Sequence, residues 1–597
     1  MASSQDNFVS KTNPDPYDQI IVLSQKVINA GFKNMWKLAQ GDDDSPLTHF
    51  KKSIHGEYIE ADVGIPSVKL HVESREPMLY FLLALKNGEM AVYESDDSDT
   101  LFKWDIKDWV LAFNVVISKC NGCPSTGRSM EPAPNHPSLP LLDQKKITKD
   151  SEEYRKFKER AGLPESNFSL AQLFIDASSS TKFNPDLTSF GEHNFNELTP
   201  AAKASVLQFI DHWIKVMSES GSSILGYSAQ REQVNGGDEL NEYAPSFPPT
   251  SIDYFCYPWR GVDGSGANKD DQDSNALAYL LMSDFKNPPA EGSIQYSGPW
   301  VDGDDRVASF CMNRALFWNW MLPIARQVVV AMTPVPETPY VSYAGTPPDM
   351  PWRTRPRYHI GDTNASANDY KWVPNPSGGW STSMPMKFTW DKVTVPHNSN
   401  DWMIGEEWGD NTQATVSFGA GTERLTVKGG SKFRYQIDHH RDGMSGTRQV
   451  WPLFWVEVFT DWRLSIDMTS IEEGGIVFHP KENNNEDVKV AYKEYGDMKM
   501  ESTAQDLAES IADDVKQNMT AALESVSETL SQAMANANRL CLPAAGTFFM
   551  KDPVFNEGGD LLVKLEYDGA DPPPPPSKGK YRFRPPMVTA SVRRMDS

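Results

Sequence analysis

Apolar and polar positions change their period several times along the chain, and each change predicts a different element. From Ile20 to Leu38, apolar residues recur at helical spacing, which predicts an amphipathic helix over residues 17–39. Between Ile59 and Val72 they alternate with other residues, a pattern typical of half-buried strands. The chain is therefore expected to begin with one helix followed by a sheet.

This first sheet is expected to continue as an antiparallel meander. Apolar runs at 79–85 and 90–93 flank Asn87 and Gly88, a pair that favours the positive φ angles of a tight hairpin turn. Another apolar run at 109–117 predicts a further strand.

Residues 120–250 differ in composition, which indicates a mostly helical insertion. They open with a loop rich in Pro, Gly and Ser, and Thr199 followed by Pro200 favours the start of a helix. An apolar stripe at helical spacing then runs to Gly221, with Val206, Phe209, Ile210, Trp213 and Met217 as its members.

A second region of helix and strands follows the insertion. Helical spacing from Phe310 to Val328 passes through Pro323, which is expected to start or kink a helix there. From 386 to 494, short alternating runs separated by turn residues predict a second antiparallel sheet.

Residues 502–540 contain no Gly or Pro and predict one long helix. Ser502 and Gln505 fit a capping box at its start. At ~1.5 Å per residue, such a helix would be about 58 Å long. Its apolar stripe is rich in small residues, and its larger members include Val515, Met519, Val526 and Leu530. We expect this stripe to pack against a sheet or another helix.

Composition and charge exclude some classes of partner and location. The chain has 57 Lys and Arg against 81 Asp and Glu, a formal net charge of −24 that repels nucleic acid over most of the surface. The first residues lack the apolar stretch of a secretory signal, and five cysteines in 597 residues do not suit a disulfide framework. Cys120 and Cys123 form a lone CxxC, either a turn with inert thiols or a redox or zinc half-site. A cytoplasmic protein without a nucleic-acid partner is expected.

The sequence contains no HExxH, GxxxxGK[ST] or GxSxG motif. The densest polar cluster on a predicted strand provides the catalytic candidates Asp438, His439 and Asp442. Because neighbouring residues of a strand point to opposite faces, His439 and His440 cannot both ligate one metal from a regular strand. Binding without catalysis is favoured, and neither a metal nor a cofactor is expected.

Two basic features stand out from the acidic background. Arg353, Arg355 and Arg357 alternate, so an extended backbone places all three on one side, as a phosphate or carboxylate site requires. The tail after the proline run contains Lys578, Lys580, Arg582 and Arg584, a pattern that attaches proteins peripherally to anionic membranes. The alternative is that these cations only neutralise acidic residues in the rest of the chain.

Three segments carry a resemblance to a known family. They are Tyr17 to Ser24 with Val27-Ile28-Asn29, Asp302-Gly303 to Pro323, and Leu542-Pro543 to Tyr567 with Gly558-Gly559-Asp560-Leu561-Leu562. With the order of predicted elements, they resemble the tubular lipid-binding (TULIP) superfamily, and within it the tubular accessory proteins encoded beside clostridial neurotoxins. The resemblance implies a curved antiparallel sheet wrapped around a long helix, with an apolar groove between them and no catalytic residues.

The predicted class is therefore α+β, with two tubular modules of curved antiparallel sheet wrapped on long helices. The expected parts are a first module at 1–119, the insertion at 120–250, a second module at 251–570, and a Pro-rich spacer with a basic tail at 571–597.

The leading functional hypothesis is that a lipid or other apolar small molecule binds beside Val515, Met519, Val526 and Leu530, with the arginine row and the tail at its headgroup. One alternative is a scaffold or toxin-associated interaction protein without a ligand. The other is an enzyme acting on an apolar metabolite through Asp438, His439 and Asp442.

Overall fold

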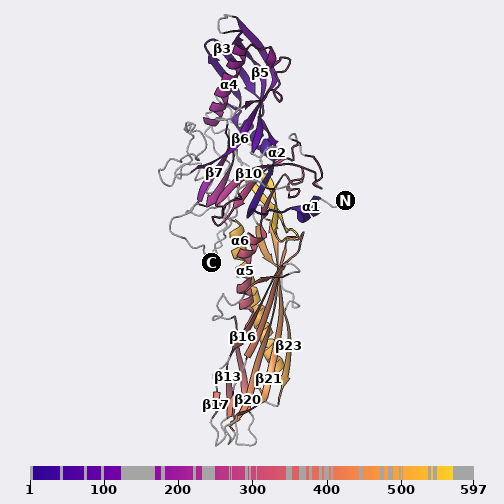
Figure 1. Cartoon of the computed structure of the whole chain (residues 1–597). Helices are drawn as coiled ribbons and strands as arrows, with labels where there is room; N and C mark the ends of the chain where they lie inside the picture. The colour runs from indigo at the N-terminus through magenta and orange to yellow at the C-terminus, as the bar shows by residue number, and fades with distance from the viewer. Residues whose placement is uncertain are drawn as a thin grey trace.

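The structure is a computed structural model, and Figure 1 shows an elongated molecule with α4, β3 and β5 at one end and β17, β20 and β21 at the other. It describes residues 4–40, 45–72, 77–95, 100–122, 168–176, 182–219, 224–231, 249–261, 263–267, 269, 272–289, 294, 297–303, 305–343, 352–361, 371–375, 379–388, 393–395, 402–404, 408–442, 448–470, 476–481, 488–496, 499–500, 502–535, 540–541 and 547–568. Antiparallel strands dominate these residues, as an α+β class requires.

Five α-helices and one short 3-10 helix are described: α1 (Ser4–Lys11), α2 (Gln25–Ala39), η1 (Phe195–Glu197), α4 (Pro200–Glu219), α5 (Arg314–Ala331) and α6 (Ala504–Ala535). The first sheet has 15 strands: β1 (Gln19–Ser24), β2 (His49–Ile54), β3 (Glu57–Val63), β4 (Ser67–His71), β5 (Met78–Tyr93), β6 (Leu101–Gly122), β7 (Phe168–Asp176), β8 (Lys182–Phe183), β9 (Ile224–Arg231), β10 (Ser251–Tyr257), β11 (Ala276–Met282), β12 (Ala308–Met312), β25 (Leu540–Cys541), β26 (Thr547–Phe555) and β27 (Leu561–Asp568).

The second sheet has seven strands: β15 (Val373–Pro374), β16 (Trp380–Phe388), β19 (Trp408–Phe418), β20 (Arg424–Asp442), β21 (Arg448–Ser470), β22 (Ile476–Pro480) and β23 (Val488–Tyr495). Two small sheets complete the strands: β13 (Pro334–Tyr343) with β14 (Trp352–Ile360) and β24 (Lys499–Met500), and β17 (Val393–Val395) with β18 (Trp402–Ile404).

The predicted helix over 17–39 is wrong in its first part. Gln19–Ser24 forms β1, which pairs antiparallel with both β11 and β12, and α2 begins only at Gln25. All six residues of β1 are buried, because this central strand is covered on both faces. It therefore lacks the alternation of apolar and polar residues that identifies a half-buried strand. Ser24 then caps α2, because its hydroxyl oxygen accepts a hydrogen bond from the Val27 amide at 3.3 Å.

The predicted hairpin turn at Asn87 and Gly88 is also wrong, since β5 continues through both residues and pairs with β6 along its length. Gly88 serves a different purpose there. Its φ is 154°, and a Cβ atom would lie 2.2 Å from the carbonyl oxygen of Glu60 on β3. The glycine allows β3 to approach β5 closely beside a register shift between Ala61 and Val63.

The helix predicted after Thr199 is confirmed as α4. The Thr199 hydroxyl accepts a hydrogen bond from the Ala202 amide, and the predicted stripe of Val206, Phe209, Ile210, Trp213 and Met217 is buried. Pro323 does not start a helix, because it lies inside α5, which begins nine residues before it at Arg314. The side chain of Asn313 caps the start of α5. The domain boundaries remain a prediction, and the first sheet joins strands from residues 19–312 to strands from 540–568.

The region predicted as one helix over 502–540 contains α6, whose start and end both differ from the prediction. The capping box is formed by Thr503 and Asp506, one residue after the predicted pair of Ser502 and Gln505. The Thr503 amide donates to the Asp506 carboxylate at 2.9 Å, and the Asp506 amide donates to the Thr503 hydroxyl at 3.0 Å. The helix is described to Ala535, and Leu540 lies in β25.

The two large sheets meet at a cluster of aromatic rings. The Trp318 ring of α5 lies 4.3 Å from the Trp380 ring of β16 and 5.7 Å from the Phe555 ring of β26. The centre of the Phe418 ring, at the end of β19, lies 5.4 Å from the centre of the Phe555 ring. These contacts join strands of both sheets through α5.

Candidate functional site

The second sheet has an inner face, which we define as the face that packs against α6. Tyr358 of β14 marks this side, because its hydroxyl contacts Ser510 and Asp514 of α6 while its ring lies 6.1 Å from Phe433. Burial, followed by the hydrogen bond to the Asp514 carboxylate, raises the pKa of Tyr358 and outweighs the lowering by the Ser510 contact, so the phenol stays protonated. Ser527 of α6 also donates to the carbonyl oxygen of Phe478 on β22.

The predicted apolar stripe of α6 lies against this inner face. Val515, Met519 and Val526 are 0%, 1% and 5% exposed and belong to the hydrophobic core that includes the inner face of β20 and β21. Leu530 lies in α6, but its side chain is outside the described part. The stripe is therefore in the predicted place, and in the described part it is packed by other side chains.

A row of three hydroxyl groups crosses the inner face between apolar rows. Thr412, Ser431 and Thr460 come from β19, β20 and β21 and are all buried. The Thr412 hydroxyl donates to the Ser431 hydroxyl at 3.4 Å, and the Thr460 hydroxyl donates to the Ser431 carbonyl oxygen at 3.5 Å. The row provides polar atoms inside an otherwise apolar layer.

Trp462 lies one row further along the same face, opposite Gly429 of β20. Because Gly429 has no side chain, the indole approaches its backbone closely, and a Cβ atom on Gly429 would lie 2.3 Å from the ring. Trp462 is 3% exposed, and its indole Nε1 has no hydrogen-bond partner among the described residues.

An indole N–H without an acceptor costs free energy in a buried position, by about 1–3 kcal/mol. An acceptor oxygen placed at Nε1 would remove that cost. Ester, carboxylate and hydroxyl oxygens are acceptors of this kind.

The sequence-based prediction missed this polar row and Trp462. One signal was available, since the pair Gly429-Gly430 interrupts a strand pattern and glycine inside a strand often marks a close approach. The identity of the residue that approaches could not be read from the sequence, because Trp462 is 33 positions away along the chain.

The structure places the arginine row on β14, which pairs with β13. Arg357 is exposed, whereas the side chains of Arg353 and Arg355 lie outside the described part. Lys578, Lys580, Arg582 and Arg584 also lie outside the described residues. A headgroup site at these cations stays a prediction.

The three catalytic candidates lie at the far end of β20. A register shift between Ile437 and Asp438 precedes them, and Asp438, His439 and Asp442 pair with residues of β21. Their side chains are not among those described, so a catalytic role for them stays a prediction. Within the described ranges, no group of three or more His, Cys, Asp or Glu could hold a metal ion.

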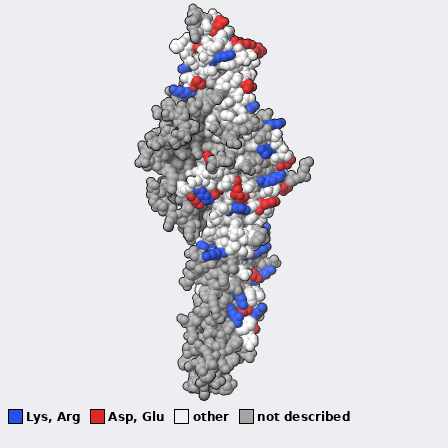
Figure 2. All heavy atoms as spheres, viewed as in Figure 1, with Lys and Arg blue, Asp and Glu red and all other residues white. Residues whose placement is uncertain are grey.

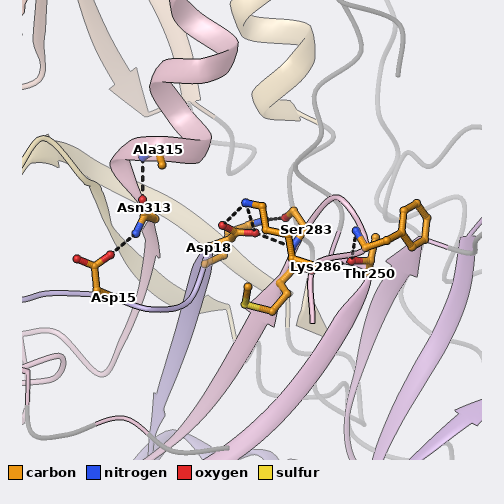
Figure 3. A network of polar contacts seen from close by, with 10 residues as sticks. Asp15, Asp18, Thr250, Ser283, Lys286, Asn313 and Ala315 are labelled. Carbon is orange, nitrogen blue, oxygen red and sulfur yellow. Dashed lines mark hydrogen bonds and ion pairs between the residues drawn. The ribbon is translucent and has the colours of Figure 1, made fainter. Parts of the chain in front are cut away.

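The segments that carry the family resemblance come together in the first sheet, where β12 lies between β1 and β27. Polar contacts fix this junction, as Figure 3 shows. Lys286 donates to Asp18 at 2.7 Å, and Asn313 donates to Asp15 at 2.7 Å while it accepts from the Ala315 amide at 2.7 Å. The start of β1 is thereby tied to β11 and to the first turn of α5.

Among the described residues, no helix is long and apolar enough to span a membrane.

No protein-family model and no curated protein matches the chain.

The solved structures that are similar to the chain include the following three, each with a low TM-score. P47 from Clostridium botulinum A2 has a TM-score of 0.42 and 9% identity and covers 93% of this chain and 98% of that chain. P47 of Clostridium botulinum E1 has a TM-score of 0.40 and 8% identity and covers 92% of this chain and 98% of that chain. A lipopolysaccharide binding protein has a TM-score of 0.30 and 11% identity and covers 92% of this chain and 99% of that chain.

Proposed function

We propose that this protein binds a lipid or another apolar small molecule between α6 and the inner face of the second sheet. The buried Nε1 of Trp462, which lacks an acceptor among the described residues, is the observation that carries the proposal. The ligand would place an oxygen at this N–H and its apolar part along the α6 stripe.

The surroundings of Trp462 support an apolar ligand. The second sheet lies on one side of the stripe, and α6 contacts β14, β21, β22 and β23. The hairpin of β13 and β14 also contacts β20, so helix and hairpin both cover the inner face. We read this arrangement as the tubular module that the sequence predicts.

Entry of a ligand requires repacking of the stripe, because Val515 and Met519 are almost fully buried. Met519 suits that task, since its unbranched side chain has three rotatable bonds and fills irregular spaces. Leu530 would lie further along the same path on α6.

The test begins with organic extraction of the purified full chain and mass spectrometry of the extract. Equilibrium binding of oleic acid and of phosphatidylcholine is then measured for the wild type and for Trp462→Phe, which keeps an aromatic ring and removes the N–H. The loss of one hydrogen bond is expected to weaken binding by about 2–10-fold.

Trp455→Phe is the matched control, because Trp455 lies on the opposite face of the same strand. Its binding should equal that of the wild type. Absence of extracted lipid together with absence of binding to both probes would reject the proposal.

A scaffold that presents its surfaces without a ligand is the second candidate. The complete burial of Val515 by neighbouring side chains favours it. Ligands that bind only the folded state raise the melting temperature. A melting temperature that does not change at saturating oleic acid would therefore support the scaffold.

A further inference from the structure

The outer face of the second sheet, which points away from α6, carries a network of cations and aromatic rings. Lys432 and Arg434 both contact the Glu457 carboxylate, at 2.7 and 3.1 Å. The Arg434 guanidinium lies 5.2 Å from the centre of the Trp455 ring, which stacks on Tyr495 of β23. These contacts place side chains of β20, β21 and β23 on one face.

This face is positive although the chain is strongly acidic. By strand alternation and register, seven of its described side chains are cationic and three are anionic, a formal charge of +4: Arg424, Lys428, Lys432, Arg434, Arg463, Lys489 and Lys493 against Glu457, Asp461 and Asp467. In Figure 2, Lys and Arg lie over the lower part of the described surface, with a few Asp and Glu among them.

Two of these cations oppose each other. Lys428 of β20 and Arg463 of β21 are direct cross-strand partners, and both are exposed. Like charges directly opposite each other destabilise a sheet. Neither side chain has an ion-pair partner among the described residues, which points to a role in binding a negative partner.

The exposed side of α6 has the opposite charge. The helix contains six acidic residues and one basic residue, and the exposed acids are Asp506, Glu509, Asp513, Glu524 and Glu528. Since the buried side of α6 faces the inner surface of the sheet, these carboxylates point away from it. Sheet and helix therefore present charges of opposite sign on opposite sides of this part of the molecule.

The two charged rows also match in length. From Arg424 to Arg434, ten strand steps of ~3.3 Å span about 33 Å. From Asp506 to Glu528, 22 helical steps of ~1.5 Å span about 33 Å. One row can therefore lie along the other.

We propose that the outer face of the second sheet binds the exposed side of α6 of a second copy of this chain. The contact joins two different surfaces, so each copy keeps one surface of each sign available for another copy. Tyr495, 53% exposed and stacked on Trp455, supplies an apolar anchor beside the cations.

The pattern favours a protein surface over a lipid surface. Glu457, Asp461 and Asp467 lie among the cations, and an anionic bilayer would place phosphates against these carboxylates. A helix with separated carboxylates can instead match individual cations.

Sedimentation velocity of the full chain tests the proposal. The wild type is expected to associate with rising protein concentration at about 50 mM salt and to dissociate at about 500 mM, because salt screens exposed charges. Lys428→Glu with Arg463→Glu should weaken association at least tenfold, and so should Glu509→Lys with Glu524→Lys.

A mixture of the two reversed variants provides the decisive sample. It brings the sheet face with two new carboxylates against the helix with two new ammonium groups, and also a wild-type sheet face against a wild-type helix, so association should return. This recovery also shows that both variants fold.

Lys103→Glu with Lys107→Glu is the matched control, because it makes the same charge change on exposed residues of β6 in the first sheet. It should associate like the wild type. A wild type that stays monomeric at low salt overturns the proposal, as does association that neither reversal weakens. Monomeric protein that binds phosphatidylserine vesicles through Lys428 and Arg463 also overturns it.

Discussion

Lys428 and Arg463 lie directly opposite each other across β20 and β21, on the exposed outer face of the second sheet. Lys428→Gln should therefore increase the free energy of unfolding, by about 0.2–1 kcal/mol, since a like-charge pair is removed. Urea unfolding at low protein concentration, where self-association does not contribute, measures this change. Lys432→Gln on the same strand is the control. It should lower the free energy of unfolding, because Lys432 pairs with Glu457.

Gly429→Ala should destabilise the second sheet by about 1–3 kcal/mol, because the new methyl group collides with the Trp462 indole. The near-ultraviolet circular dichroism of the folded protein should change as well, since the ring must move. In a Trp462→Leu background the same substitution should cost much less. Equal costs in both backgrounds would contradict the packing of this indole on Gly429.

Thr503→Ala should lower the stability of α6 by about 0.5–2 kcal/mol, because the Asp506 amide loses its cap. Ser502→Ala changes the residue just before the cap and should have an effect within about 0.5 kcal/mol. Chemical denaturation of both variants compares the two positions. A larger loss for Ser502→Ala would place the capping box where the sequence predicts it.

Asp467 should make a small, pH-dependent contribution to stability. Arg424 donates two hydrogen bonds to Asp467, at 2.7 and 2.8 Å, and these hydrogen bonds hold the pKa of the carboxyl below its usual value. Because the folded pKa is depressed, the stabilisation is complete above the unfolded pKa of about 3.9 and is lost as pH falls through the folded pKa.

Both partners are partly exposed, so solvent screening limits the effect to about 1 kcal/mol or less. Urea unfolding between about pH 6 and pH 2 compares the wild type with Asp467→Asn. The difference in stability should shrink toward zero at the acidic end. A difference that stays constant with pH would show that the ionised carboxyl is not its source.

The sequence predicted elements well where one local pattern decides them. Residues 200–219 and 504–535 form helices because apolar residues recur every three or four positions, without an interrupting Gly and with a cap at the start. The α6 stripe is buried as predicted at Val515, Met519 and Val526. Their partners on the sheet, however, are distant in sequence.

Local patterns failed where neighbouring strands determine the conformation. Gln19–Ser24 is a strand because β11 and β12 bury both of its faces, although its apolar run continues into a helix. Gly88 is extended because β3 approaches it, not because it turns the chain. No short window of residues contains these partners.

The sequence alone determined the sheet-rich class, the negative charge, the α4 helix and the amphipathic α6 helix, since composition and periodicity are properties of short stretches of chain. Tertiary structure decided that Thr412, Ser431 and Thr460 form one polar row, that Trp462 packs on Gly429, and that Lys428 faces Arg463. Strand register sets all three arrangements, and register depends on the pairing of segments far apart in the chain.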